Sequence, residues 1–268
     1  MTSIVITTQG PSPLILSMPH PGTGLPPEVE ATLNARGRLV EDTDWHMRQL
    51  YAFAERFSPT IVEAQLSRFV IDLNRDPSGV SLYPGQATTE LVPTTTFDGA
   101  PIWETPPDET EIARRRDAYF RPYHEALSAE IARVKAAHGY CLLWDCHSIK
   151  SMIPRLFPGT LPTLNLGTNS GASCAPEIEA AAVKAMAGQP QTQIVNGRFK
   201  GGWITRHYGQ PANHVHAIQM EKALSAYLAE EQAPWRFDAP KAAELQSALS
   251  AIIAAALDAA ATLEGQRS

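Results

Sequence analysis

The sequence predicts a single α/β domain with a mixed, mostly parallel sheet flanked by helices. Short apolar runs typical of buried strands alternate with helical patterns along the chain. The chain has 268 residues, which is long enough to bury one large core. No internal repeat and no linker-like stretch divides it, so residues 1–268 are expected to form one domain.

Composition and charge exclude several classes of protein. Hydrophobic residues make up 44% of the chain and the formal net charge is −6, so neither nucleic acid nor an anionic membrane is an expected partner. No apolar run approaches the roughly 20 residues of a membrane helix, and the N-terminus lacks a signal-peptide pattern. Cys141, Cys146 and Cys174 favour free thiols in a reducing compartment, so a cytoplasmic protein is expected. A homo-oligomer is compatible with the sequence.

The first part of the chain alternates between strand and helix patterns. Residues 13–18 read as a strand that runs into turn formers at 19–24. The helical pattern from 47 to 57 has Thr43 or Asp42 as candidate caps. Residues 60–64 and 69–73 are short β-rich runs, and 77–107 is a long polar loop of the kind that often forms a functional lid or insertion.

The second part continues the alternation. A long helix is predicted over 109–138, kinked or divided by Pro122 and ended by Gly139. Further strands are predicted at 142–148, 163–166, 193–196 and 215–220, and a helix at 176–186. Residues 151–162 read as irregular, 197–209 as a glycine-rich basic loop, and 240–263 as an alanine-rich amphipathic helix that packs on the sheet.

Titratable side chains stand at the ends of three predicted strands. His147 ends the run 142–148 two residues after Asp145, His20 follows 13–18, and Glu221 ends 215–220. Parallel strands bring their carboxyl ends to one edge of a sheet, where ligands bind. The sequence therefore predicts that these groups converge although they are far apart along the chain.

The converging groups suit a catalytic zinc site, which uses three histidine or carboxylate ligands and leaves a position for water. The carboxylate would come from Asp44 or Asp42, and Glu221 would move a proton beside the metal. No His-Glu-x-x-His helix supports this reading. The alternative, in which core histidines bond to nearby acids and the two aspartates stand at a helix start, stays open at this point.

Arginines in an acidic chain point to an anionic ligand. Three of them, Arg68, Arg75 and Arg206, lie in predicted loops or at strand ends. Arg75 follows Asn74 and Arg206 follows Thr205, so two of the three stand beside a polar residue. Guanidinium groups bind carboxylates through paired hydrogen bonds. The competing interpretation is surface charge or ion pairs with Asp72 and Asp76.

Two other chemistries are disfavoured. A serine hydrolase would need a nucleophilic serine, but the Gly-x-Ser-x-Gly elbow is absent and Ser148 adjoins His147, so their side chains point to opposite faces of a strand. The glycines of 197–209 match neither phosphate-binding fingerprint, and no strand-loop-helix unit is expected around them.

Seven stretches, in order along the chain, resemble the N-formylglutamate amidohydrolase (deformylase) family. They are 17–22 (SMPHPG), 42–46 (DTDWH), 67–75 (SRFVIDLNR), 145–149 (DCHSI), 165–169 (NLGTN), 196–209 (NGRFKGGWITRHYG) and 216–221 (HAIQME). The resemblance implies a fold similar to zinc carboxypeptidases and aspartoacylases, with one Zn²⁺ per chain. The implied reaction converts N-formyl-L-glutamate, a small anionic N-acyl amino acid, to L-glutamate and formate in histidine degradation.

The resemblance also assigns the metal ligands. His20 and His147 match the two histidine ligands, but the position three residues after His20, a carboxylate in the carboxypeptidase pattern, is Thr23 here. The acid must therefore come from elsewhere. We favour Asp44 as the ligand, and Asp42 is then expected beside the ligands as a supporting group.

Further roles follow from the same resemblance. Glu221 corresponds to the general acid/base and Arg68 to the arginine that polarises the scissile carbonyl. Asn74 and Arg75 resemble the pair that binds a substrate carboxylate. Asp145 is expected to accept a hydrogen bond from His147, since metal-binding histidines usually donate their other N–H to a carboxylate or carbonyl.

Arg206, with its neighbour Thr205, is expected to help hold the two substrate carboxylates. A related deacylase acting on acetyl or succinyl derivatives of aspartate or glutamate is the closest alternative function. A non-catalytic protein that binds an acidic metabolite on the same fold is a second alternative.

Overall fold

The computed structural model describes residues 4–266; residues 1–3, part of the N-terminal stretch without a signal-peptide pattern, and 267–268 lie outside this range. The strands form one seven-stranded sheet in the order β1-β3-β2-β4-β7-β5-β6. Their bounds are β1 Val5–Thr8, β2 Leu14–Met18, β3 Thr60–Ala64, β4 Cys141–Ile149, β5 Leu164–Gly167, β6 Gln193–Val195 and β7 Val215–Ala223. The β1–β3 and β5–β7 pairs are antiparallel and the other neighbours are parallel, which confirms the predicted mixed, mostly parallel sheet.

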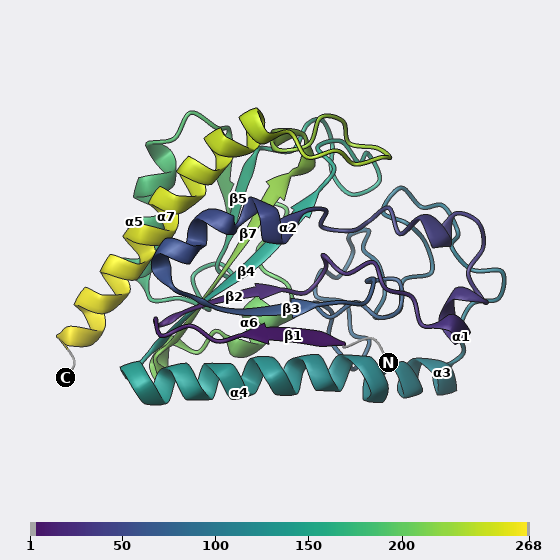
Figure 1. Cartoon of the computed structure of the whole chain (residues 1–268), viewed down its shortest axis with the longest axis horizontal. Coiled ribbons are helices and arrows are strands. Elements are labelled where there is room, and N and C mark those ends of the chain that lie inside the picture. The colour runs from purple at the N-terminus through teal and green to yellow at the C-terminus, as the bar shows by residue number, and fades with distance from the viewer. Residues whose placement is uncertain (1–3, 267–268) are drawn as a thin grey trace.

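Helices cover both faces of the sheet (Figure 1). Their bounds are α1 Pro27–Glu30, α2 Met47–Leu50, α3 Glu109–Arg115, α4 Arg121–His138, α5 Pro176–Ala187, α6 Trp203–Tyr208 and α7 Ala239–Gly265. Apolar side chains of α2, α5 and α7 pack with one face, and those of α4 and α6 pack with the other. Each central strand is therefore buried on both sides, which explains why these strands read as continuous apolar runs.

Strand alternation decides which side chains of β4 reach the site. Trp144 belongs to the core beneath α5 and α7, whereas Leu143 belongs to the core beneath α4. Residues two apart on a strand share a face, so Asp145 and His147 continue the α4 side. The parallel register places Glu221 of β7 directly beside His147. Both groups are thus fixed by regular backbone.

The segment that carries Asp44 differs from its prediction. Neither candidate cap is used: the Asp42 carboxylate accepts a hydrogen bond from the Phe97 N–H, and the Thr43 hydroxyl donates to the Val40 carbonyl. The helical pattern is realised as the short helix α2 followed by a 3₁₀ segment, Ala52–Phe57.

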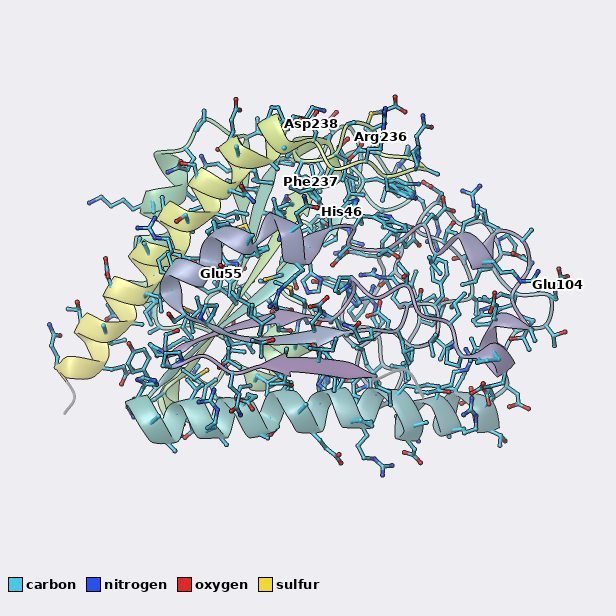
Figure 2. The ribbon with its side chains drawn as sticks, in the orientation of Figure 1. His46, Glu55, Glu104, Arg236, Phe237 and Asp238 are labelled. Carbon is cyan, nitrogen blue, oxygen red and sulfur yellow. The ribbon has the colours of Figure 1, made fainter. Side chains whose placement is uncertain are left out.

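His46 directly precedes α2 in the left-handed conformation, with φ of 54°, and its side chain does not cap the helix. Its ring packs against Phe237, with centroids 5.7 Å apart, and its Nε2–H donates to the Trp235 carbonyl (Figure 2). Tertiary contacts with the 235–237 segment therefore position the start of this helix, in place of a cap.

Two other predictions need correction. Residues 69–73 are turn and irregular backbone, not a strand: their apolar side chains are buried in the core under α4 without joining the sheet. The segment predicted as a glycine-rich loop contains α6, so β6, the loop and α6 do form a strand-loop-helix unit.

The long helical segment behaves as predicted. It is divided into α3, a π-helical turn Arg116–Phe120, and α4, which begins with Pro122 in its first turn. Gly139 ends α4 with φ of 83°, a conformation that favours glycine. The chain from 77 to 107 contains no helix or regular strand, as expected of an extended loop.

Helix α7 is long and apolar enough, by length and composition, to cross a membrane. This corrects the expectation that no apolar segment approaches that length. Leu249, Ile252 and Ile253 are fully buried against the sheet and α5. The composition of α7 is therefore accounted for by its place in the core.

Candidate active site

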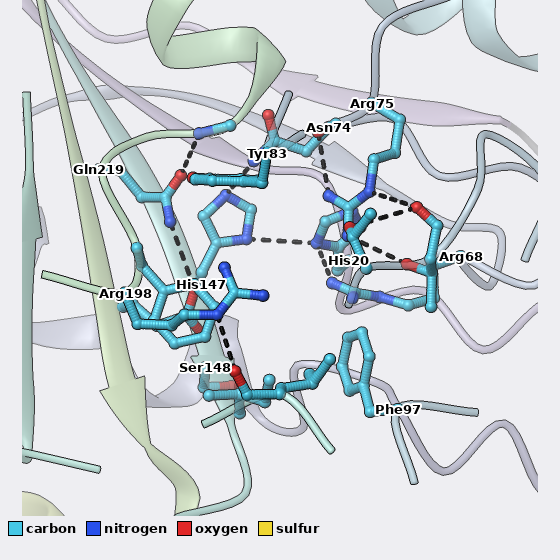
Figure 3. A pocket seen from close by; sticks show the side chains of 17 residues that line it. His20, Arg68, Asn74, Arg75, Tyr83, Phe97, His147, Ser148, Arg198 and Gln219 are labelled. Atoms are coloured by element: carbon cyan, nitrogen blue, oxygen red, sulfur yellow. Dashed lines mark hydrogen bonds between the residues drawn. The ribbon is translucent and has the colours of Figure 1, made fainter. Parts of the chain in front are cut away.

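A pocket lies at the carboxyl ends of β2, β4 and β7 (Figure 3). Most of its lining residues have polar side chains, and they come from distant parts of the chain: His20, the 68–97 segment, 147–149 of β4, Leu156, the 198–202 loop, and Gln219 and Glu221 of β7. The convergence predicted from strand ends therefore occurs at one site.

His20, Asp44 and His147 bring three potential metal ligands together, with ligand atoms within 4.8 Å of one another. The two Nδ1 atoms are 3.2 Å apart, and Asp44 Oδ2 lies 3.3 Å from Nδ1 of His147 and 3.7 Å from Nδ1 of His20. The Asp44 N–H donates to the His20 carbonyl, which ties the two segments together. These are the three residues predicted from the sequence as metal ligands.

The chemistry of this group fits a divalent cation. Asp44 is fully buried, and neither carboxylate oxygen has a hydrogen-bond partner within residues 4–266. Burial alone would raise the pKa of Asp44, but its contacts with His147 and His20 hold it below its ordinary value. A buried carboxylate without hydrogen bonds is costly, and two imidazole nitrogens with one carboxylate form a known catalytic zinc ligand set.

Each histidine is oriented by a further carboxylate. His147 Nε2 lies 2.9 Å from Asp145 Oδ2, and His20 Nε2 lies 2.8 Å from Asp72 Oδ1. An N–H donated from Nε2 leaves Nδ1 of each ring facing Asp44, which is the usual support of metal-binding histidines. Asp145 was predicted in this place. Asp72 was missed, because the sequence suggested it only as an ion-pair partner of the arginines.

Asp42 is not part of the ligand group found among residues 4–266. Its Oδ2 accepts the Phe97 N–H at 2.7 Å. Burial raises the pKa of Asp42 to about 7. The expected support beside the ligands is therefore provided by Asp72, whereas Asp42 positions the backbone of Phe97.

Arg68 and Glu221 flank the candidate ligands. Nη2 of Arg68 donates to Nδ1 of His20 and lies 3.8 Å from Asp44 Oδ1. Glu221 is buried, and burial raises its pKa to about 7 despite the opposing effect of His147. A carboxyl group that titrates near neutral pH is suited to accept a proton and release it again.

Two guanidinium groups line the pocket beyond this centre. Arg75 donates to the backbone and side-chain oxygens of Thr89 and lies 3.7 Å from Asp72 Oδ2. Arg198, which the sequence analysis did not select, lies over the Tyr83 ring at 5.2 Å. Its position in the basic 197–209 segment marks Arg198 as a candidate for binding an anion, but the direction of its side chain was not predictable from the sequence.

Asn74 lines the pocket, and its side-chain amide also contacts neighbouring groups of the site. Its Nδ2 donates to Asp145 and lies 2.9 Å from Nε2 of His147, and its Oδ1 accepts the Ile204 N–H. Asn74 therefore links the 67–75 segment, β4 and the start of α6.

Thr205 and Arg206 are not among the residues that line the pocket. Thr205 is fully buried within α6. Arg206 donates to the Gly201 and Leu82 carbonyls, and its guanidinium group lies over the Tyr83 ring. Arg206 thus supports the loop that carries Tyr83.

Fold and site together define an α/β protein with a polar, arginine-lined pocket at the carboxyl edge of its sheet, the usual position of ligand sites in this class. The chain belongs to the N-formylglutamate amidohydrolase family, whose model matches residues 12–228.

Individual relatives agree with this membership. An N-formylglutamate deformylase of Pseudomonas aeruginosa is 47% identical over 257 residues, covering 94% of each chain. One of Pseudomonas putida is 44% identical over 261 residues, covering 96% of this chain and 97% of its own. The crystal structure of N-formylglutamate amidohydrolase from Ralstonia eutropha JMP134 has a TM-score of 0.78 at 24% identity and covers 95% of this chain and 97% of its own. The resemblance noted in the sequence is confirmed, and the structural likeness supports the fold.

Proposed function

We propose that this protein hydrolyses N-formyl-L-glutamate to L-glutamate and formate, with one Zn²⁺ held by His20, Asp44 and His147. The observation that carries the proposal is the juxtaposition of this ligand group with a buried Glu221 and, in the same pocket, three arginines. The names of the two Pseudomonas relatives support the substrate.

Two residues, Glu221 and Arg68, are proposed to act on the reacting atoms. A bound zinc ion supplies a Lewis acid and lowers the pKa of water. Glu221 accepts a proton from the attacking water as the new C–O bond forms at the formyl carbon. Arg68 stabilises the negative charge that develops on the formyl oxygen. Glu221 then returns the proton to the amide nitrogen as the C–N bond breaks, so that glutamate and formate leave.

Arg75 and Arg198 are proposed to bind the two carboxylates of the substrate. Replacing Arg198 with methionine is expected to raise KM for N-formyl-L-glutamate by about 10- to 100-fold, because a hydrogen bond to a charged group contributes about 1.5–3 kcal/mol. N-formyl-L-norvaline, which lacks the side-chain carboxylate, measures the discrimination that this arginine provides. Arg236→Met is the matched control, because Arg236 (labelled in Figure 2) is exposed and is not among the residues that line the pocket. An unchanged KM in the Arg198 variant would remove Arg198 from substrate binding.

Formate release and metal content, measured on the same purified sample, test the proposed function. We expect N-formyl-L-glutamate to have the highest kcat/KM in a panel with acetyl and succinyl derivatives of glutamate and aspartate. A preference for another acyl group would instead support the related deacylase. A metal-loaded protein without turnover on any of them would contradict an enzymatic function.

The cellular setting is part of the proposal. Cys141, Cys146 and Cys174 are free and buried, which is compatible with a reducing cytoplasm. Membership of the family supports a place in histidine degradation.

A further inference from the structure

A second, much smaller cavity adjoins the active-site pocket. The two share Phe97, Ser148 and Ile149 as walls. The small cavity has a volume of about 10 Å³, which is about the space that one water molecule needs. Shared walls mean that a few side chains separate the reaction centre from this space.

Part of the wall of the small cavity belongs to the segments that carry two of the candidate metal ligands. Asp42 and Thr43, which form part of its wall, directly precede Asp44 in the chain, and Ser148 directly follows His147. Arg75 and Arg198, the residues proposed to bind the substrate carboxylates, line the active-site pocket but not the small cavity. The cavity therefore adjoins the segments that carry Asp44 and His147.

Phe97 is held firmly between the two spaces. Its side chain is buried, its N–H donates to Asp42, and the Arg68 guanidinium group lies 4.8 Å from the centre of its ring. It also packs in a small apolar cluster with Ile149 and Ile153. Figure 3 shows its ring beside Arg68. Contacts on several sides leave the ring little freedom to swing away from a ligand.

We infer that Phe97 limits the size of the acyl group, an inference that rests on the proposed function. When the substrate carboxylates lie at Arg75 and Arg198 and the scissile carbonyl lies at Arg68, the acyl substituent extends past the carbonyl carbon toward Phe97. In a formyl group this substituent is a hydrogen atom. In an acetyl or longer group it is a carbon chain that meets the ring, whereas a shorter residue at position 97 joins the small cavity to the pocket.

The test compares kcat/KM for N-formyl-, N-acetyl- and N-propionyl-L-glutamate in the wild type, Phe97→Leu and Phe97→Ala. We expect the acetyl-to-formyl ratio of kcat/KM to rise about tenfold or more in both variants, since one methyl group in a fitted pocket is typically discriminated by about 10- to 200-fold. Phe199→Leu is the matched control, because Phe199 packs on the same apolar cluster and lines the pocket but not the small cavity.

Phe97→Leu keeps most of the apolar volume, so it tests the inference even where Phe97→Ala fails to fold, as thermal unfolding would show. A folded Phe97→Leu variant with the wild-type ratio, or an equal rise in Phe199→Leu, would overturn the inference while the proposed function stands. A wild-type enzyme that is inactive on N-formyl-L-glutamate would overturn both.

Discussion

Replacing Glu221 with glutamine is expected to lower kcat by about 10²–10⁴-fold, the usual contribution of a positioned general acid or base. Glutamine keeps the size of the side chain and can still accept a hydrogen bond from Gln219, but it cannot take a proton from water or deliver one to the departing nitrogen. Formate release under saturating substrate measures the effect. Metal content should equal that of the wild type, because Glu221 is outside the ligand group.

The pH profile separates a catalytic from a structural role of Glu221. Burial raises the pKa of Glu221 to about 7, and a base works only when deprotonated, so wild-type kcat/KM should fall as the pH drops through about 7. Residual activity of Glu221→Gln should lack this acidic limb. A variant with wild-type kcat would rule out Glu221 as the acid/base, and an unchanged acidic limb would assign that titration to another group.

Regular structure made the central part of the site predictable. His20, His147 and Glu221 stand at or just beyond the carboxyl ends of parallel strands, and the topology of a parallel sheet brings such positions together without knowledge of any contact. Asp145 was predictable for the same reason, because residues two apart on a strand share a face.

The other residues of the site lie in irregular segments, and their positions were not predictable from the sequence. The run 69–73 has the apolar composition of a strand because its side chains are buried, although its backbone does not join the sheet. The position of Asp72 beside His20 was therefore not predicted. Arg198 and Arg206 lie in one segment of similar composition, yet only Arg198 lines the pocket. Loops and short helices provide no period from which side-chain direction can be read, so such choices depend on tertiary contacts.

Asp44 and Asp42 also lie in an irregular segment, so the choice between them as metal ligand depends on tertiary contacts. A substitution at Asp44 tests this choice. Replacing Asp44 with asparagine is expected to reduce metal affinity by more than the 10- to 100-fold typical of groups that only support the ligands. Activity should fall in parallel, because the variant loses a charged ligand from the group formed with His20 and His147. Metal content after dialysis and formate release on the same sample measure both effects.

Asp42→Asn is the matched control for this prediction, because Asp42 is also buried but bonds to Phe97, and an asparagine oxygen can accept the same N–H. It should keep its metal. Thermal unfolding adds a readout that does not depend on turnover: a ligand that binds only the folded state stabilises it, so a chelator should lower Tm in the wild type and in Asp42→Asn but barely in Asp44→Asn. The reverse pattern would make Asp42 the ligand, whereas no chelator effect in any of the three proteins would argue against a metal centre. The buried Asp44 carboxylate, whose oxygens have no hydrogen-bond partner within residues 4–266, favours the first outcome.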